Sequence, residues 1–306
     1  MTDAFRPLLR SRAFLCFFVL VAAASVALLM SRRIVRLHNV VIGKGGGRDL
    51  HAEIAYPNRP NGLLPAIIYI HGGGWITGSP SEGPIEALAK AGYFAASIEY
   101  RLSGEAKWPA QIEDCKLGVR WLRANASKYH VAPDRIGVWG GSAGGHLALC
   151  LDTMADVKNY EGAGGYPGVS SAVQAVVDFC GATDFMDPGP YGKEALRFTQ
   201  ELFGVPHDQN PELWKSGSPI AYVKAGDAPL LLVYGDSDRL CPLIQATAFE
   251  TALTKAGVPH RLIVVKNGMH GFQPVPGKTT DPSFEGIMRT MGAFFDQYLR
   301  GGRAIQ

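Results

Sequence analysis

One serine in this chain of 306 residues stands in a turn that suits nucleophilic chemistry. Ser142 is the central residue of a G-x-S-x-G sequence at 140–144, between a strand-like run at 135–140 and a helix-like run at 143–155. A serine held between a strand and a helix occupies a sharp, strained turn, and the flanking glycines let neighbouring backbone approach closely. The pattern predicts that Ser142 is a nucleophile; the alternative is a glycine turn with an incidental serine.

A serine hydroxyl needs a nearby base, because at its ordinary pKa it is a poor nucleophile. His270 lies in a loop just past the apolar run 260–266, with glycines on both sides, and is predicted to be that base. His146 lies one helical turn beyond Ser142, and we expect it to have a structural role or to line the site wall. His207 lies in a segment without a preceding strand.

An orienting acid completes the predicted set. Asp236 and Asp238 both follow the apolar run 228–235. Asp238 is favoured because a carboxylate well beyond the strand end can reach a histidine loop, whereas Asp236 is placed to cap the turn. The sequence therefore predicts Ser142, Asp238 and His270 as catalytic residues.

The sequence His71-Gly72-Gly73-Gly74-Trp75 follows another apolar run. Consecutive glycines can direct their N–H groups toward one point and stabilise an oxyanion. Alone, the pattern also fits a flexible loop or a phosphate cradle, although it lacks the lysine of a P-loop. Together with Ser142 it predicts an oxyanion hole formed by Gly73, by Gly72 or Gly74, and by the N–H of Ala143.

The elements that position these residues alternate along the chain. An antiparallel hairpin is expected at 34–57, and later strands at 65–71, 93–100, 135–140, 173–181, 228–235 and 260–266. Helices are expected at 84–92, 109–128, 143–155, 243–256 and 282–299, with an irregular region at 182–227.

Strands separated by helices predict one α/β domain at 37–306, with a mostly parallel sheet, helices on both faces and no large cap. The active sites of such sheets lie outside the carboxyl ends of the strands, and every candidate residue falls there.

The first 36 residues form a separate segment. Residues 13–30 carry no charge and are flanked by arginines, which predicts an export signal or a membrane anchor. A buried core helix is the less favoured alternative. We expect an exported protein that is either anchored by this segment or periplasmic or secreted after its cleavage. Three arginines on each side do not orient the span.

Charge and cysteine content exclude some functions. The net charge is +3, but six arginines and one aspartate lie in residues 1–36, so the remainder has 24 basic and 26 acidic residues. No nucleic-acid surface is indicated. No two cysteines have CxxC spacing, so a zinc site is not expected. Cys115, Cys150, Cys180 and Cys241 are interpreted as buried thiols, with one disulfide as the alternative.

Other side chains have less specific patterns. Trp75 and Trp108 are candidate walls for a sugar ring, and Trp214 a weaker one; packing is the alternative for each. Asp114, Lys116 and Arg120 are interpreted as a solvated, salt-bridged helix face.

Five segments together resemble the α/β-hydrolase superfamily, and within it the HGGG-bearing esterases and lipases related to hormone-sensitive lipase. The segments are "HGGGWITGSP", "EYRLSGEAKWPAQIEDCKLGVRWLRANASKY", "RIGVWGGSAGGHLAL", "YGDSDRLCP" and "GMHGF". They are most similar to the BD-FAE subgroup, which includes carbohydrate acetyl esterases and feruloyl-esterase-like enzymes. The order Ser142, Asp238, His270 is that of α/β-hydrolases. Two features depart from many relatives: no substantial cap precedes the core, and residues 182–223 match nothing recognisable.

The resemblance implies metal-free hydrolysis of short acyl esters through an acyl-enzyme, commonly of acetyl groups on sugars or polysaccharides. It implies Ser142, Asp238 and His270 as the catalytic residues, and Gly72, Gly73 and Ala143 as oxyanion donors. The expected partner is therefore a small-molecule or polysaccharide ester. Alternatives with the same three residues are a peptidase related to acylaminoacyl peptidases and an aryl-formamidase. A catalytically silent, anchored binding protein is the alternative outside the enzymes.

Overall fold

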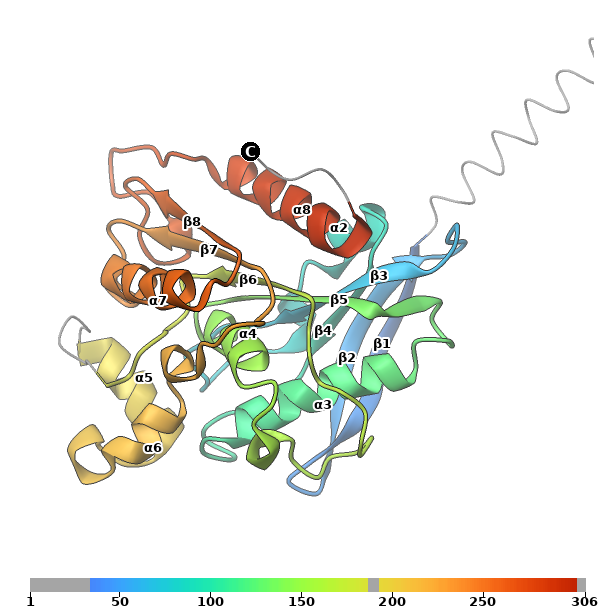
Figure 1. Cartoon of the computed structure of the whole chain (residues 1–306), viewed down its shortest axis with the longest axis horizontal. Helices are drawn as coiled ribbons and strands as arrows, with labels where there is room; N and C mark the ends of the chain where they lie inside the picture. Colours follow the sequence, from blue (N-terminus) through green and yellow to red (C-terminus); the bar gives the residue numbers. More distant parts are fainter. Residues whose placement is uncertain (1–33, 187–192, 302–306) are drawn as a thin grey trace, which may run out of the picture.

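The apolar runs of the sequence become the strands of one eight-stranded sheet in the computed structural model, which describes residues 34–186 and 193–301 (Figure 1). The strands are β1 (Ile34–Gly45), β2 (Arg48–Pro57), β3 (Leu64–Ile70), β4 (Phe94–Ile98), β5 (Val131–Gly141), β6 (Ala175–Phe179), β7 (Leu230–Gly235) and β8 (His260–Val265). The helices are α2 (Ile85–Lys90), α3 (Ala110–Ala124), α4 (Ala143–Thr153), α5 (Lys193–Phe203), α6 (Pro211–Ser216), α7 (Leu243–Ala256) and α8 (Phe284–Arg300).

The sheet has the order β1-β2-β4-β3-β5-β6-β7-β8. β2 pairs antiparallel with β1 and with β4, and every later pairing from β4 to β8 is parallel. The predicted antiparallel start and parallel remainder are confirmed. All residues of β4, β6 and β7 are buried, because helices cover both faces of the sheet. In Figure 1, α2 and α8 lie on one face, and α3, α4 and α7 on the other.

The register of the parallel strands brings their carboxyl ends to one edge. Ile70 of β3 pairs with Gly140 of β5, and Gly141 pairs with Phe179 of β6. Phe179 in turn pairs with Val233 of β7. The residues that follow these strands therefore meet at the same edge, as the sequence predicts.

The prediction of an irregular region at 182–227 was wrong for its described part. That part contains the helices α5 and α6 (Figure 1). In α5, Ala195, Thr199, Leu202 and Phe203 are buried on one side of the helix. This spacing of three to four residues is a helical signal, but α5 is only 11 residues long. The segment connects β6 to β7 along the chain.

The prediction that Asp114, Lys116 and Arg120 form a solvated face was also wrong. All three are buried in α3. Asp114 accepts two hydrogen bonds from the Arg101 side chain, and Lys116 and Arg120 both pair with Glu161. Residues 158–165 cover this side of α3, so charges that suit an exposed face are enclosed together with their partners.

The predicted apolar span at 13–30 lies outside the described residues. Among the residues that the structure does describe, none of the helices has the length and apolar character needed to cross a membrane. The four cysteines of the described chain, Cys115, Cys150, Cys180 and Cys241, are free and buried, as the sequence predicts.

Candidate active site

Ser142 occupies a strained turn between β5 and α4. Its backbone has φ 55° and ψ −122°, in a region that non-glycine residues rarely adopt. The N–H of Ser142 donates to the carbonyl of Phe179 at 2.8 Å, which ties the turn to the end of β6. A Cβ atom on Gly140 would lie 2.2 Å from the carbonyl oxygen of Gly144, so this tight turn requires glycine.

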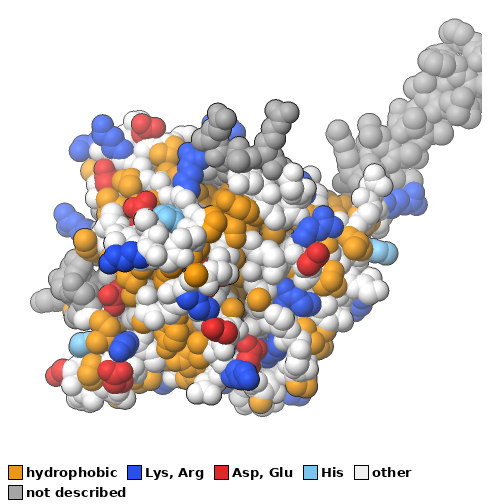
Figure 2. Space-filling model, in the orientation of Figure 1, with side chains coloured by type: hydrophobic (Ala, Val, Ile, Leu, Met, Phe, Trp, Pro, Cys, Tyr) orange, Lys and Arg blue, Asp and Glu red, His pale blue; other side chains and the backbone are white. Residues whose placement is uncertain are grey.

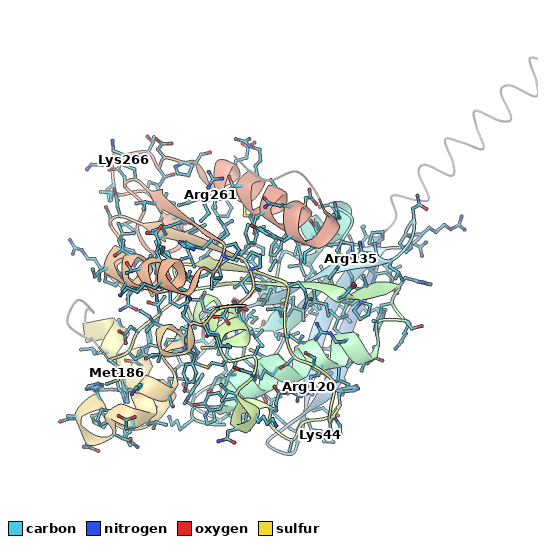
Figure 3. All side chains as sticks on the ribbon, viewed as in Figure 1. Lys44, Arg120, Arg135, Met186, Arg261 and Lys266 are labelled. Atoms are coloured by element: carbon cyan, nitrogen blue, oxygen red, sulfur yellow. The ribbon has the colours of Figure 1, made fainter. Side chains whose placement is uncertain are left out.

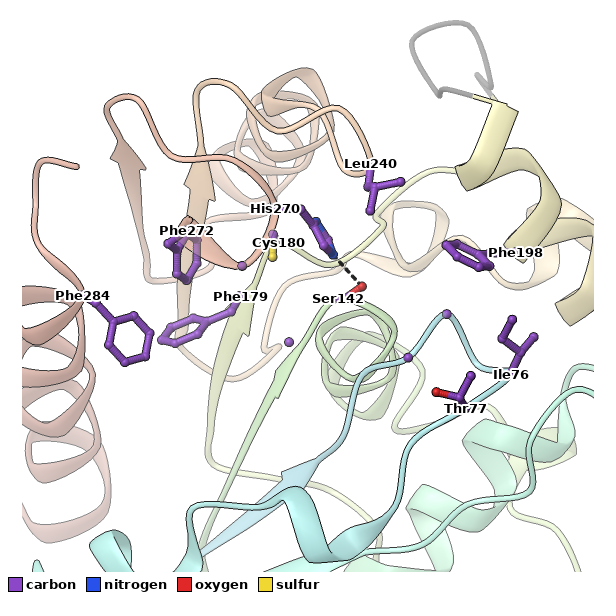
Figure 4. Close-up of a pocket in the computed structure, with 14 residues that line it drawn as sticks. Ile76, Thr77, Ser142, Phe179, Cys180, Phe198, Leu240, His270, Phe272 and Phe284 are labelled. Atoms are coloured by element: carbon purple, nitrogen blue, oxygen red, sulfur yellow. Dashed lines mark hydrogen bonds between the residues drawn. The ribbon is translucent and has the colours of Figure 1, made fainter. Parts of the chain in front are cut away.

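The structure brings the predicted serine, histidine and aspartate together. Nε2 of His270 lies 2.9 Å from the hydroxyl oxygen of Ser142, within hydrogen-bond distance (Figure 4). When the imidazole is neutral, Nε2 carries no proton and accepts from this hydroxyl. Nδ1–H of His270 donates to Oδ2 of Asp238 at 2.8 Å, which fixes the tautomer because a carboxylate only accepts. The other oxygen of Asp238 accepts from the backbone N–H groups of Leu240 and Cys241. Asp236 instead accepts from the hydroxyl of Ser237, within its own turn.

The environment of His270 favours its protonated form. Burial alone lowers the pKa of the imidazole, but the hydrogen bond to Asp238 and the neighbouring thiol of Cys180 outweigh burial and raise the pKa to about 10. The side chain of Asp238 is fully buried, so its attraction for the imidazolium is screened little by water. This arrangement stabilises the charge that appears when His270 accepts a proton.

Cys180 is a site residue that sequence reasoning missed. It follows β6 at the same edge as the other candidates, has a φ of 48° and lines the pocket beside His270. Asp178 holds this turn, because one of its oxygens accepts from the N–H of Gly181 and the other from the hydroxyl of Tyr234. Burial raises the pKa of Asp178 to about 7. The position of Cys180 directly after a strand was the available signal.

The glycine loop after β3 lies against Ser142. The ring of His71 stacks on Tyr100, with centroids 4.2 Å apart, and the Tyr100 hydroxyl donates to the His71 carbonyl. Gly73 and Gly74 have φ of 102° and 59° and line the pocket. Within the described chain, the N–H groups of these two glycines and of Ala143 donate to no protein acceptor. Gly72, by contrast, lies against the Gly141 carbonyl and is not among the pocket-lining residues.

An open pocket of about 490 Å³ surrounds Ser142 and His270 (Figure 4). Its walls are mainly apolar. Phe179, Phe272 and Phe284 lie to one side of Ser142 in the view of Figure 4, and Ile76, Phe198 and Leu240 to the other. Sequence reasoning named none of these six side chains, because single apolar residues in loops look the same whether they face a pocket or the core.

A second, smaller cavity of about 40 Å³ also touches Ser142. It is lined by Gly74, Trp75, Ser142, Ala143, Ala182, Ala195, Phe198, Thr199, Leu240 and Cys241. Six of these ten residues are buried, and the cavity shares Gly74, Ser142, Phe198 and Leu240 with the open pocket. His270 is not among them, whereas it does line the open pocket. Trp75 therefore lies next to the site, in the wall of this small cavity.

The other predicted site walls lie in the core. Trp108 packs against His146 and Tyr160, and its indole N–H donates to Ser216. It lines neither cavity that contains Ser142, so the structure does not bring it to the site. Trp214 is also buried and stacks on Phe203.

His146 is fully buried beside Trp75 and Trp108. Nε2–H donates to the carbonyl of Gly217 at 2.8 Å. Burial lowers the pKa of its imidazole to about 4, so the ring is neutral at pH 7. His146 has the structural role that was one of the two expected from the sequence, and it lines neither cavity at Ser142.

One group of side chains in the described residues has the donor atoms for a metal ion. Atoms of Cys180, Asp238 and His270 all lie within 4.8 Å of one another. However, Nδ1 of His270 and Oδ2 of Asp238 already share a proton at 2.8 Å, and a cation between them would have to displace it. The geometry therefore fits proton transfer better than metal binding.

Comparison with known proteins places this site in a recognised context. Residues 52–253 match the BD-FAE family. The esterases LipQ and LipC of Mycobacterium tuberculosis are 31% and 30% identical, over 72% and 85% of this chain. These alignments cover 53% of LipQ and 65% of LipC, so the chain spans about half to two thirds of these curated relatives.

Two solved structures are similar over nearly the whole described chain. A truncated carbohydrate esterase from gut microbiota is 29% identical with a TM-score of 0.76, covering 88% of this chain and 98% of that one. The propionate-bound esterase Est2 of Thermogutta terrifontis is 26% identical with a TM-score of 0.70, covering 90% and 97%.

Proposed function

Because this chain belongs to the BD-FAE family of α/β-hydrolases, we propose that it is a serine carboxylic ester hydrolase. One observation carries the proposal: the continuous hydrogen-bonded path from Ser142 Oγ through His270 to Asp238, which opens into a pocket. In this arrangement a serine can lose its proton as it attacks a carbonyl carbon.

The reaction proceeds in two halves. Ser142 Oγ attacks the ester carbonyl while Nε2 of His270 accepts the hydroxyl proton, and the buried Asp238 stabilises the resulting imidazolium. The N–H groups of Ala143, Gly73 and Gly74 stabilise the oxyanion. Collapse of the tetrahedral intermediate expels the alcohol, which takes the proton from His270. Water then attacks the acyl-enzyme while His270 accepts one of its protons. Collapse of the second tetrahedral intermediate releases the acid, and the proton on His270 returns to Ser142 Oγ.

We propose that the two cavities at Ser142 take the two halves of the ester. The leaving alcohol must be near His270 to receive its proton, so it occupies the open pocket that His270 lines. The acyl group then takes the smaller cavity, which Ser142 and Ala143 line and His270 does not. At about 40 Å³, this cavity holds roughly three water-sized groups. It suits an acetyl or another short acyl group, and a feruloyl ring exceeds it.

For the alcohol half of the ester we propose a carbohydrate, so that the substrate is an acetylated carbohydrate. The apolar faces of Phe179, Phe272 and Phe284 in the open pocket suit the C–H face of a sugar ring. The similarity to a carbohydrate esterase and to an esterase with bound propionate supports a short acyl group on such an alcohol. We further propose that the protein is exported, on the basis of the apolar run 13–30.

Comparison of Ser142→Ala with the exposed control Ser127→Ala tests the proposal. Ser142→Ala should lower kcat on p-nitrophenyl acetate by at least ~10⁴-fold, since the nucleophile is removed, and Ser127→Ala should leave it unchanged. Esterase activity that survives Ser142→Ala would contradict the catalytic assignment.

The same protein tests the substrate. Acetate should be released from acetylated xylo-oligosaccharide and from p-nitrophenyl acetate, with little hydrolysis of p-nitrophenyl laurate or methyl ferulate. Equal rates on p-nitrophenyl acetate and p-nitrophenyl laurate would exclude the smaller cavity as the acyl site. An aminoacyl p-nitroanilide as the best substrate would favour the peptidase alternative.

A further inference from the structure

A second large cavity lies at the opposite edge of the sheet from Ser142. It has a volume of about 820 Å³ and is lined by residues around the ends of β2, α2 and α8 and the first half of β5. Four of its lining residues are basic, Arg59, Lys90, Arg135 and Arg300, and none is acidic. We call this cavity the basic groove. Figure 3 labels Arg135 near the point where the chain enters β1.

The charges of the basic groove are only partly neutralised. In the described chain, Arg59 forms no ion pair, and Arg135 donates only to the carbonyl of Leu63, at 3.4 Å. Lys90 lies 3.9 Å from Glu86 in an exposed pair, which screens its charge weakly. Arg300 pairs with Asp296 on α8. The groove therefore presents a positive surface without a carboxylate among its lining residues.

An exposed apolar side chain accompanies these charges. Leu63 lines the groove and is 54% exposed. Ile34, the first described residue, lines it as well. On the face seen in Figure 2, Lys and Arg side chains also lie near the start of the described chain. A basic surface with an exposed leucine suits the boundary between lipid headgroups and acyl chains.

The sequence before Ile34 limits how far this surface can lie from the apolar run 13–30. The uncharged run ends at Met30, and only Ser31, Arg32 and Arg33 separate it from Ile34. Four extended residue steps reach at most about 14 Å. If the run 13–30 spans or enters a membrane, this short connection keeps the groove near the lipid headgroups.

We propose that the basic groove docks this protein on a membrane surface of anionic phospholipid, with Leu63 inserted between headgroups. The arginine and lysine side chains attract the lipid phosphates, and the short connection to the apolar run holds the surfaces together. The docked orientation follows from the sheet. Arg135 and Gly141 are six residues apart on β5, or about 20 Å, so the open pocket faces away from the bilayer. The enzyme would then take its ester from the aqueous side.

The test uses the full chain in lipid nanodiscs. An environment-sensitive fluorophore is attached at Leu63→Cys in a Cys16→Ser background, and quenching by spin-labelled lipid is measured with neutral and with anionic bilayers. The matched control label is at Ile244→Cys, which is 57% exposed and lies on α7 next to the site. We expect strong quenching at position 63 in anionic bilayers only, and none at position 244.

Charge reversal then identifies the groove. Arg59→Glu with Arg135→Glu should abolish the quenching, whereas Arg261→Glu, an exposed charge on β8, should not. Equal quenching in neutral bilayers, or quenching that survives the double reversal, would overturn the electrostatic docking. Quenching of the label at position 63 by aqueous iodide is measured as well. If neither iodide nor spin-labelled lipid quenches this label, the protein's own chain or a second copy covers the groove, which also overturns the proposal.

Discussion

His270 and Cys180 form a pair whose effect on pH dependence can be measured. The base must be neutral to accept the proton of Ser142, and kcat/KM therefore falls as pH drops below the pKa of His270, which is raised to about 10. The thiol of Cys180 contributes to this raised pKa, so Cys180→Ala should lower it. We expect the acid limb of the pH profile to move to lower pH, with activity on the limb rising about tenfold for each pH unit that the limb moves.

Two further variants serve as a control and a comparison for this prediction. Cys115→Ala removes a free buried thiol on α3 that lines no site cavity, and it should leave the limb in place. Asp238→Asn should lower the pKa of His270 as well, but kcat should also fall by ~10³–10⁴-fold because the imidazolium loses its partner. A limb that stays at the same pH in Cys180→Ala would mean that Asp238 alone sets the pKa of His270.

At the residue level, the sequence patterns located the three catalytic candidates but missed Cys180 and the apolar side chains that line the pocket. Ser142, Asp238 and His270 were identifiable because each follows an apolar run whose end lies at a common sheet edge. Trp108 was misplaced because its aromatic type suits a sugar wall and a core equally well. Phe198 was missed because it lies on α5, a short helix in a segment whose sequence was interpreted as irregular.

The turn between β5 and α4 depends on the closeness of the backbone segments around it. A Cβ atom on Gly144 would lie 2.1 Å from the carbonyl oxygen of Ile70, so Gly144→Ala must push α4 away from β3. We expect a loss of about 2–3 kcal/mol of stability from the overpacking, and a fall in Tm on the order of 5–10 °C. Activity should fall too, because Ala143 moves with the helix.

Gly141→Ala is the matched control for the turn. A Cβ atom there would meet its nearest neighbour at 3.8 Å, which is an ordinary contact. Its Tm, measured by calorimetry beside that of Gly144→Ala, should remain close to that of the wild type. If both variants melt alike, close backbone approach is not what fixes glycine at position 144.

Helix α3 carries a buried charge cluster that should dominate its stability. Glu161 accepts from Lys116 at 2.9 Å and from Arg120 at 2.6 Å, and both cations are almost fully buried. Glu161→Gln leaves two buried cations without a charged partner. We expect a cost of about 3 kcal/mol, the low end for a broken buried pair, because Glu161 itself is one third exposed. Glu285→Gln, which breaks an exposed pair with Arg289, should cost little.

The difference in stability between the wild type and Glu161→Gln should depend on pH in a definite direction. Burial raises the pKa of Glu161, but hydrogen bonds from Lys116 and Ser171 outweigh it and hold the pKa below the ordinary value of 4.5. The stabilisation is therefore present above pH 4.5 and is lost as pH falls through the lowered pKa. Urea melts should show the gap between wild type and Glu161→Gln narrowing in acid. A constant gap would assign the loss to packing rather than to charge.

The same helix shows why an element's surroundings are harder to predict than the element itself. The periodicity of apolar residues in α3 correctly indicated a helix, and its charged residues implied a solvent-exposed face. The structure covers that face with residues 158–165, a segment whose sequence has no periodicity. Helical spacing reports which residues share a face, but not whether a distant segment of the chain closes over it.

The polarity of the sheet sets the two ends of the whole molecule apart. Parallel strands place every candidate catalytic residue at their carboxyl ends, while the basic groove and the chain's entry point lie around the opposite edge (Figure 1). The position of the catalytic end was predictable from the order of strands and helices. The groove was not, because its four basic residues come from four distant segments and form no pattern in the sequence.

If the groove docks on lipid, substrate access should be insensitive to docking. The full chain in anionic nanodiscs and in detergent should hydrolyse p-nitrophenyl acetate at the same rate. It should also release acetate equally fast from acetylated xylan, a polymer too large to pass between the protein and a bilayer. Because the open pocket faces away from the groove, the polymer reaches Ser142 in both settings. Selective loss of polymer hydrolysis in nanodiscs would show that the pocket faces the membrane, and would contradict the orientation derived from the sheet.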